Sequence, residues 1–284
     1  VQGISGTIKS IGSDTLNNLM THWSELFNKY YPAVRVEVEG KGSSTAPPAL
    51  TAGQSQFGPM SREMKSAEID EFEKKWGYKP TALRVAVDSL AIYVHKDCPL
   101  DEISMENAMK VFSVAGPEMT WGDLGLTSAE YKSKPVSLYG RNSASGTYGF
   151  FKEHVLEKKD FQNAVKEQPG SSAVVQGVAN DKFGMGYSGI GYKTADVKAL
   201  RVIPKGGKAG VAATADNAYS GEYPIARFLY IYINHDPKKA LDPLRAEFAK
   251  AIYSKQGQES VIKDGYFPVT AEIAREDLTI LAIK

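Results

Sequence analysis

The first 65 residues repeat one pattern three times: a short strand, a loop rich in glycine and hydroxyl side chains, and a helix. The strands are predicted at residues 6–12, at residues 34–39 and close to residues 57–60. Alternating strands and helices predict an α/β fold with mostly parallel sheets. Ligands of such sheets bind at the carboxyl ends of the strands, so the three loops are candidate ligand loops.

A fourth loop, residues 139–148, lies between a short apolar run and a predicted helix. It offers the guanidinium of Arg141, the hydroxyls of Ser145 and Thr147, and the backbone N–H groups of a helix N-terminus. The motif contains donors but no carboxylate, which suits a small oxyanion. The alternative is an ordinary capped helix with a surface arginine, but the convergence of four such loops favours an anion site.

Composition narrows the classes of protein that the chain can belong to. The chain has 284 residues, of which 42% are hydrophobic and 24% charged, and its net charge is +1. This indicates a soluble globular protein of one large or two medium domains, and it predicts no nucleic-acid partner. The single cysteine, Cys98, excludes an internal disulfide and a cysteine-based zinc site, and we expect no cofactor.

The start of the sequence shows no export signal, and no segment is long and apolar enough for a membrane span. No apolar run approaches the roughly 20 residues of a membrane span, and residues 1–3 lack the start of a signal peptide. The protein is therefore expected to be either cytosolic or a mature chain whose signal has been removed.

Two nucleotide-binding motifs fail on inspection. A phosphate loop built on Gly40-Lys41 would need glycine at position 35 and Ser or Thr at position 42, where Arg35 and Gly42 stand. Residues 184–189 match G-x-G-x-x-G, but a strand-like segment follows instead of a helix. We therefore expect a glycine-rich strand that lines a cleft.

Residues 83–94 and 224–233 are two long apolar runs that are predicted to form strands. The first is longer than a typical strand, and both are predicted to pass between two domains. Domain I would comprise residues 1–88 and 224–284, and domain II residues 89–223. The ligand would lie in a cleft between them and be enclosed by hinge motion. Residues 148–167 are predicted to be largely helical, and residues 205–222 to form an exposed loop.

Several motifs together resemble a known family, the periplasmic phosphate-binding proteins of phosphate ABC transporters (the PstS-like family). The resemblance covers nearly the whole chain in order, and it rests on segments 12–15, 42–44, 57–62, 141–147, 189–192 and 223–232. It implies a two-domain periplasmic binding protein of type II topology with a two-strand hinge. It also implies a mature, periplasmic, monomeric chain that delivers phosphate to an inner-membrane ABC permease.

The resemblance also implies a set of phosphate ligands. These are Thr15, Leu16, Ser43, Ser61, Arg62, Arg141, Ser145, Gly146 and Thr147. Ser61 stands where some members have an aspartate that accepts the phosphate proton, and Arg62 would then be a second cation. Our hypothesis is that Asp14 or Glu63 supplies the missing acceptor.

Two other functions remain open. The fold could bind another tetrahedral oxyanion, such as arsenate, sulfate, molybdate or a phosphonate. A phosphatase with Ser145 as nucleophile is disfavoured, because none of the four histidines lies in a recognisable catalytic motif.

Overall fold

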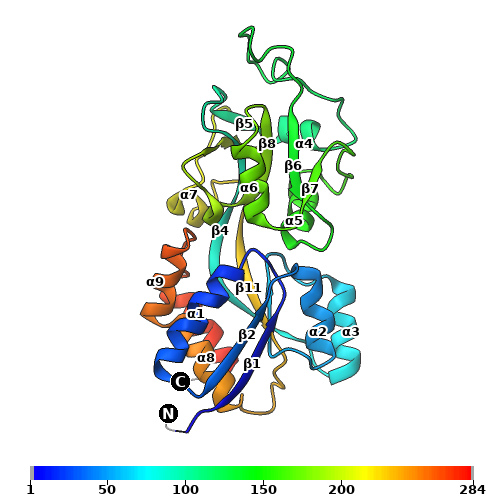
Figure 1. Ribbon diagram of the computed structural model, residues 1–284. Coiled ribbons are helices and arrows are strands. Elements are labelled where there is room, and N and C mark those ends of the chain that lie inside the picture. Colours follow the sequence, from blue (N-terminus) through cyan, green and yellow to red (C-terminus); the bar gives the residue numbers. More distant parts are fainter. Residues whose placement is uncertain (1–2, 283–284) are drawn as a thin grey trace. The chain divides into compact units, whose positions relative to one another are not determined.

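The structure, a computed structural model, describes residues 3–282 and divides into two compact units. Unit 1 contains the described residues up to Val87, Ala144–Gly146, and those from Phe228 onward; unit 2 contains Asp88–Ser143 and Thr147–Arg227. The strands and helices alternate along the chain (Figure 1), so the predicted α/β fold is confirmed. The units are described separately below.

Unit 1 is built on strands β1, β2, β3 and β11, with β1 parallel to both β2 and β3 and β11 antiparallel to β3. Helices α1 and α8 lie on one side of these strands and α2 and α3 on the other (Figure 1). The elements are β1 (Gly6–Ile11), α1 (Asn17–Tyr30), β2 (Val34–Glu39), η1 (Ser43–Thr45), α2 (Ala46–Thr51), β3 (Phe57–Met60), α3 (Ser66–Trp76), β11 (Ala226–Ile233), α8 (Pro243–Tyr253), α9 (Lys255–Lys263) and α10 (Ala271–Ile280).

The core of unit 1 forms where α1 meets the C-terminal helices. Leu19, Trp23 and Phe27 are fully buried, and each contributes roughly 1.5–3 kcal/mol through the removal of its side chain from water. The indole N–H of Trp23 donates to the backbone oxygen of Gly257 at 2.8 Å. This contact attaches α1 to α9, more than 200 residues later in the chain.

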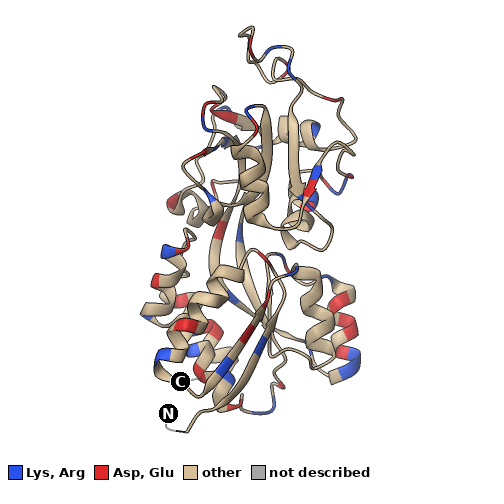
Figure 2. Ribbon diagram, viewed as in Figure 1, with Lys and Arg blue, Asp and Glu red and all other residues tan. Residues whose placement is uncertain are grey.

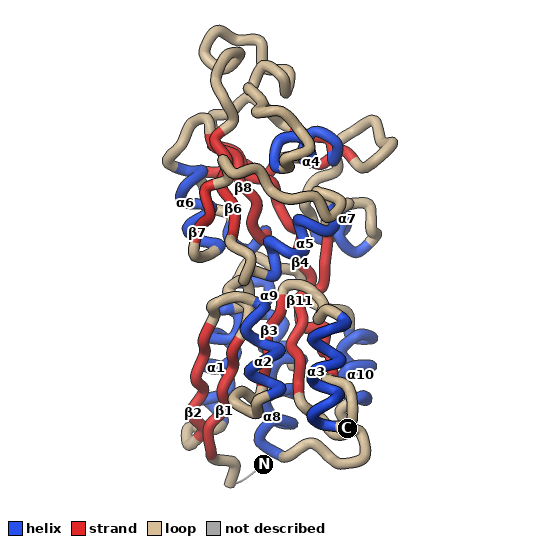
Figure 3. Tube along the Cα trace, turned by 90° about the vertical axis from the view of Figure 1, so that its right-hand side faces the viewer, coloured by secondary structure: helices blue, strands red, loops and turns tan. Residues whose placement is uncertain are grey.

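Unit 2 contains a sheet in which β8 lies between β4 and β6, with β7 at one edge; Figure 3 shows β6, β7 and β8 beside α6. The elements are β4 (Thr81–His95), β5 (Glu102–Ser104), α4 (Met105–Phe112), β6 (Ser137–Arg141), α5 (Gly146–His154), β7 (Lys166–Gln168), α6 (Ser171–Ala179), β8 (Gly184–Gly189), η2 (Ile190–Tyr192), β9 (Val197–Ala199), β10 (Arg201–Ile203) and α7 (Ala215–Tyr219). Phe112, Phe151 and Tyr187 stack or meet edge to face at the centre of its core.

The chain passes from one unit to the other within β4 and within β11. The boundaries fall at 87/88 and 227/228, whereas the sequence analysis placed them at 88/89 and 223/224. Residues 144–146 group with unit 1, which the sequence analysis did not anticipate. The predicted hinge and cleft stay predictions.

Three local predictions were wrong. The helix expected over 148–167 ends at His154, because Glu157 and Lys158 adopt positive φ angles of 52° and 68°. The loop expected at 205–222 contains α7, which the Thr214 side chain caps. Residues 190–192 form one 3-10 turn rather than a strand.

Charged residues of both signs are interspersed along both units (Figure 2), in keeping with the net charge of +1. Within residues 3–282, no helix is both long and apolar enough to span a bilayer.

Candidate anion-binding site

Three serine hydroxyls meet in unit 1, and each follows a different strand of the sheet. Ser13 follows β1, Ser43 begins η1 after β2, and Ser61 follows β3. The Ser13 hydroxyl donates to Ser61 Oγ at 3.1 Å, and Oγ of Ser43 lies 3.2 Å from Oγ of Ser61. All three are buried, so the carboxyl ends of the three strands carry one hydroxyl cluster, which we call the serine cluster.

Backbone contacts hold the loops of the serine cluster together. The N–H of Ser13 donates to the oxygen of Pro59, and the N–H of Gly42 donates to the oxygen of Gly12, both at 2.8 Å. A Cβ atom at Gly12 would lie 2.1 Å from the oxygen of Pro59. Glycine is therefore required for this approach of the first loop to the third.

The segment Ala144–Gly146 packs against the serine cluster. A Cβ atom at Gly146 would lie 2.1 Å from Oγ of Ser43 and 2.6 Å from Oγ of Ser61. The N–H of Ser44 donates to the oxygen of Ala144 at 3.1 Å. The start of α5, and with it the buried Ser145, is thereby placed on the serine loops.

Thr15 and Leu16 lie at the beginning of α1, beside the serine cluster. The N–H of Thr15 donates to the hydroxyl of Ser13 at 3.1 Å, and Tyr266 donates to the oxygen of Thr15 at 3.2 Å. Leu16 is the N-cap residue, and no side chain caps the helix. The Ser13 hydroxyl does not cap α1, because it bonds to Ser61 and to the N–H of Thr15.

Arg62 is buried and paired within unit 1. Its terminal nitrogens donate to both carboxylate oxygens of Glu68 at 2.7 and 2.8 Å, and one of them lies 3.4 Å from Oγ of Ser44. Burial alone would raise the pKa of Glu68, but the hydrogen bonds and charge of Arg62 bring it below its ordinary value. The positive charge of Arg62 is thus shared with a carboxylate, while the side chain braces the loop of Ser44.

The two proposed proton acceptors have different surroundings. Glu63 accepts a hydrogen bond from the hydroxyl of Tyr230 at 3.1 Å. The backbone oxygen of Asp14 accepts from the N–H of Asn17 in the first turn of α1. Neither contact tests the hypothesis that one of them accepts a proton from the ligand.

Arg141 and Thr147 belong to unit 2, and both are buried. The guanidinium of Arg141 donates to Oγ of Ser171 at 2.9 Å, and its backbone N–H donates to the hydroxyl of Tyr187 at 3.1 Å. Burial of a cation without compensation is very costly, so hydroxyl and backbone acceptors around Arg141 are expected. Arg227 donates to the hydroxyl of Thr147 at 3.0 Å.

Sequence reasoning missed two charged residues in unit 2, Asp88 and Arg227, which form a buried ion pair with a 2.7 Å contact. A signal was present, since each is a charged residue within a long apolar strand. Ser13 was not among the predicted phosphate ligands, although its hydroxyl belongs to the serine cluster.

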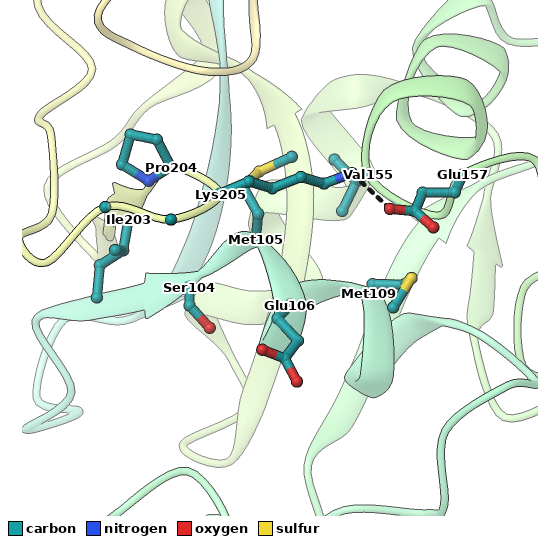
Figure 4. A pocket seen from close by; sticks show the side chains of 11 residues that line it. Ser104, Met105, Glu106, Met109, Val155, Glu157, Ile203, Pro204 and Lys205 are labelled. Atoms are coloured by element: carbon teal, nitrogen blue, oxygen red, sulfur yellow. Dashed lines mark hydrogen bonds and ion pairs between the residues drawn. The ribbon is translucent and has the colours of Figure 1, made fainter.

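Unit 2 also has a hollow of about 470 Å³ between α4 and residues 203–207 (Figure 4). Its apolar lining comes from Met105, Met109 and Val155, and its charged groups include Glu106 and the ion pair of Glu157 with Lys205. Two carboxylates disfavour an anion here. Among residues 3–282, no three acidic, histidine or cysteine side chains gather in a way that could hold a metal.

The whole chain is also similar to known proteins. A family model described as the PBP superfamily domain matches residues 1–256. The phosphate-binding protein PstS of Pseudomonas aeruginosa is 52% identical to this chain, over 99% of the chain and 88% of the relative. Protein SphX of Synechococcus elongatus is 29% identical over 80% of the chain and 68% of its own length.

Two solved structures show the same fold. One is a putative phosphate ABC transporter substrate-binding protein with bound phosphate from Clostridium perfringens, with a TM-score of 0.79, 23% identity and coverage of 93% of this chain and all of the other. The second, a possible phosphate-binding protein from Planctomyces limnophilus, has a TM-score of 0.71, 25% identity and 99% coverage of both chains.

Proposed function

This chain belongs to the PstS-like phosphate-binding proteins of the PBP superfamily, and we propose that it binds inorganic phosphate and delivers it to an ABC permease. The 52% identity to the Pseudomonas aeruginosa protein across 99% of the chain is the observation that carries this proposal. The fold is the α/β fold of periplasmic binding proteins.

The proposed site combines groups of both units around one anion. Unit 1 would contribute the hydroxyls of the serine cluster and of Thr15, together with the N–H groups of Leu16 and Gly146. Unit 2 would contribute the cation Arg141 and the hydroxyl of Thr147. The packing of Gly146 on Ser43 and Ser61 supports this arrangement, because Thr147 is the next residue in the chain.

Phosphate must lose its water shell to enter such a site, and fixed dipoles must replace that shell. Buried hydroxyls, helix N-termini and one guanidinium are suited to this task. We assign the main electrostatic role to Arg141. Arg62 would act by holding the loop of Ser44 and by adding long-range positive potential, since Glu68 already occupies its terminal nitrogens.

We propose that binding is reversible and that the chain performs no covalent chemistry. It would act as a monomer in the periplasm and present its phosphate-bound form to the permease. If the protein hydrolyses a chromogenic phosphate ester and Ser145→Ala abolishes the hydrolysis, the proposal is contradicted and the phosphatase alternative is favoured.

Titration calorimetry with phosphate tests the proposal. Arg141→Ala should weaken binding by about 3–5 kcal/mol, the usual effect of removing one partner of a buried charge interaction. Arg35→Ala is the matched control, because Arg35 is an exposed arginine on β2 and should leave affinity unchanged. Near-native affinity of Arg141→Ala would refute the site. If arsenate, sulfate or molybdate binds the native protein more tightly than phosphate in a competition titration, that anion is the ligand instead.

A further inference from the structure

Asp88 and Arg227 form a buried ion pair inside unit 2. Asp88 lies on β4 and Arg227 on β11, each at the point where its strand leaves the unit. The Asp88 side chain is 0% exposed and that of Arg227 is 2% exposed. Buried ion pairs contribute little to stability relative to packed apolar side chains, so stability alone does not account for this one.

The guanidinium of Arg227 is fixed from several directions. Its Nε and Nη2 atoms donate to one carboxylate oxygen of Asp88 at 2.9 and 2.7 Å. The other carboxylate oxygen accepts from the N–H of Ile190 at 2.9 Å. The guanidinium carbon also lies 5.3 Å from the centre of the Phe150 ring, on the helix that begins beside Thr147. These contacts leave the guanidinium little freedom to rotate.

The same Nη2 atom donates to the hydroxyl oxygen of Thr147 at 3.0 Å. A hydroxyl has one hydrogen to donate and two lone pairs that accept. Because Thr147 accepts from Arg227, its own O–H must point away from the guanidinium. The charge on Arg227 also polarises this O–H bond and strengthens it as a donor.

We propose that Asp88 and Arg227 are a positioning pair that fixes Thr147 as a hydrogen-bond donor. The inference rests on the proposed phosphate-binding function and adds a specificity rule to it. The Thr147 donor favours an unprotonated phosphate oxygen at this position over a P–OH group, because a charged oxygen is the stronger hydrogen-bond acceptor. Arg227 acts through Thr147 and through its orientation, without contacting the ligand.

A double-mutant cycle with phosphate calorimetry tests the pair. The ion pair is replaced by apolar side chains of similar size in Asp88→Leu/Arg227→Met, in the native background and in a Thr147→Val background. The replacement should weaken phosphate binding about 10-fold in the native background and less than about 2-fold with Thr147→Val, because the donor it orients is then gone. Thermal unfolding without phosphate checks that each variant folds.

Equal losses of affinity in the two backgrounds would overturn the proposal and leave the pair a structural role. If the apolar pair does not fold, the cycle uses Asp88→Asn/Arg227→Gln, which keeps both side chains polar but removes both charges. The native protein is titrated first. If it does not bind phosphate, the proposed function fails. If it binds phosphate but the ion-pair replacement weakens binding equally in both backgrounds, only the positioning pair fails.

Discussion

Gly146 packs against the serine cluster so closely that no side chain fits at this position. Its Cα stands where an added Cβ would overlap Oγ of Ser43 and Oγ of Ser61, both of which are buried. Buried hydroxyls in a packed environment cannot move aside without losing contacts. Gly146 therefore packs closely on the loops after β2 and β3, within unit 1.

Gly146→Ala should weaken phosphate binding by about 1–3 kcal/mol, because the serine hydroxyls must shift from their hydrogen-bonding positions. Calorimetry measures this loss. Gly77→Ala is the control. Gly77 has a φ of +80°, so alanine there should lower the stability of the fold, but the affinity for phosphate should be unchanged. Unaltered affinity of Gly146→Ala would show that the ligand does not use this surface.

A second residue-scale prediction concerns the pH dependence of stability. Burial raises the pKa of Asp264 to about 6, although the charge of His22 and a hydrogen bond from Asn18 oppose the shift. One of its carboxylate oxygens is buried and lacks a hydrogen-bond partner among the described residues. The folded state binds the proton more tightly than the unfolded state, so stability falls as pH rises from about 4 to 6 and stays lower above that range.

Asp264→Asn should therefore raise the free energy of unfolding by about 1–2 kcal/mol at pH 8, after allowance for solvent screening, and by much less near pH 4. Urea unfolding at the two pH values measures the difference. Asp70→Asn, at an exposed position on α3, is the control. A gain of equal size at both pH values would exclude deprotonation of Asp264 as its cause.

At the scale of elements, α10 is held by a buried carboxylate rather than by an apolar face. Asp277 is the only buried residue among those of this helix. It accepts from the backbone N–H and the guanidinium of Arg84, both at 2.6 Å, and from the hydroxyl of Tyr253 at 2.9 Å. The buried carboxylate of Asp277 therefore connects the helix to β4 and to α8.

Asp277→Asn should lower the free energy of unfolding by about 2–4 kcal/mol, since it removes a buried charge that several donors surround. Glu276→Gln is the matched control on the same helix, because Glu276 also pairs with Arg84 but is half exposed and should contribute under about 1 kcal/mol. Chemical denaturation compares the two variants. Equal effects would mean that burial of the carboxylate is not what anchors α10.

This anchoring also shows the limit of prediction from sequence. The apolar periodicity of α1, the alternation in β2 and the length of β4 predicted those elements, because each buries a regular set of side chains. Helix α10 was missed because its attachment depends on a polar contact to Arg84, nearly 200 residues away. The serine loops were predicted from their hydroxyls, but the contact of Gly146 with them depends on packing that no local pattern encodes.

At the scale of the whole molecule, the proposed function requires groups of both units to bind one phosphate ion. Chain crossings at 87/88 and 227/228 connect the units through β4 and β11. A ligand that contacts both units stabilises both against unfolding.

Phosphate at 100 times its dissociation constant should add about 2.7 kcal/mol to the free energy of unfolding and raise the melting temperature by a few degrees. Differential scanning calorimetry measures the shift. The melting temperature of Arg141→Ala should hardly change at the same phosphate concentration, and sodium chloride at matched ionic strength serves as the salt control. A shift of native size in Arg141→Ala would mean that phosphate binds at another site.

The most direct measurement is a crystal structure of the protein grown with phosphate. We predict density for one tetrahedral ion within hydrogen-bond distance of Ser43, Arg141 and Thr147 together. An ion that contacts groups of one unit only, or that lies away from all three residues, would contradict it.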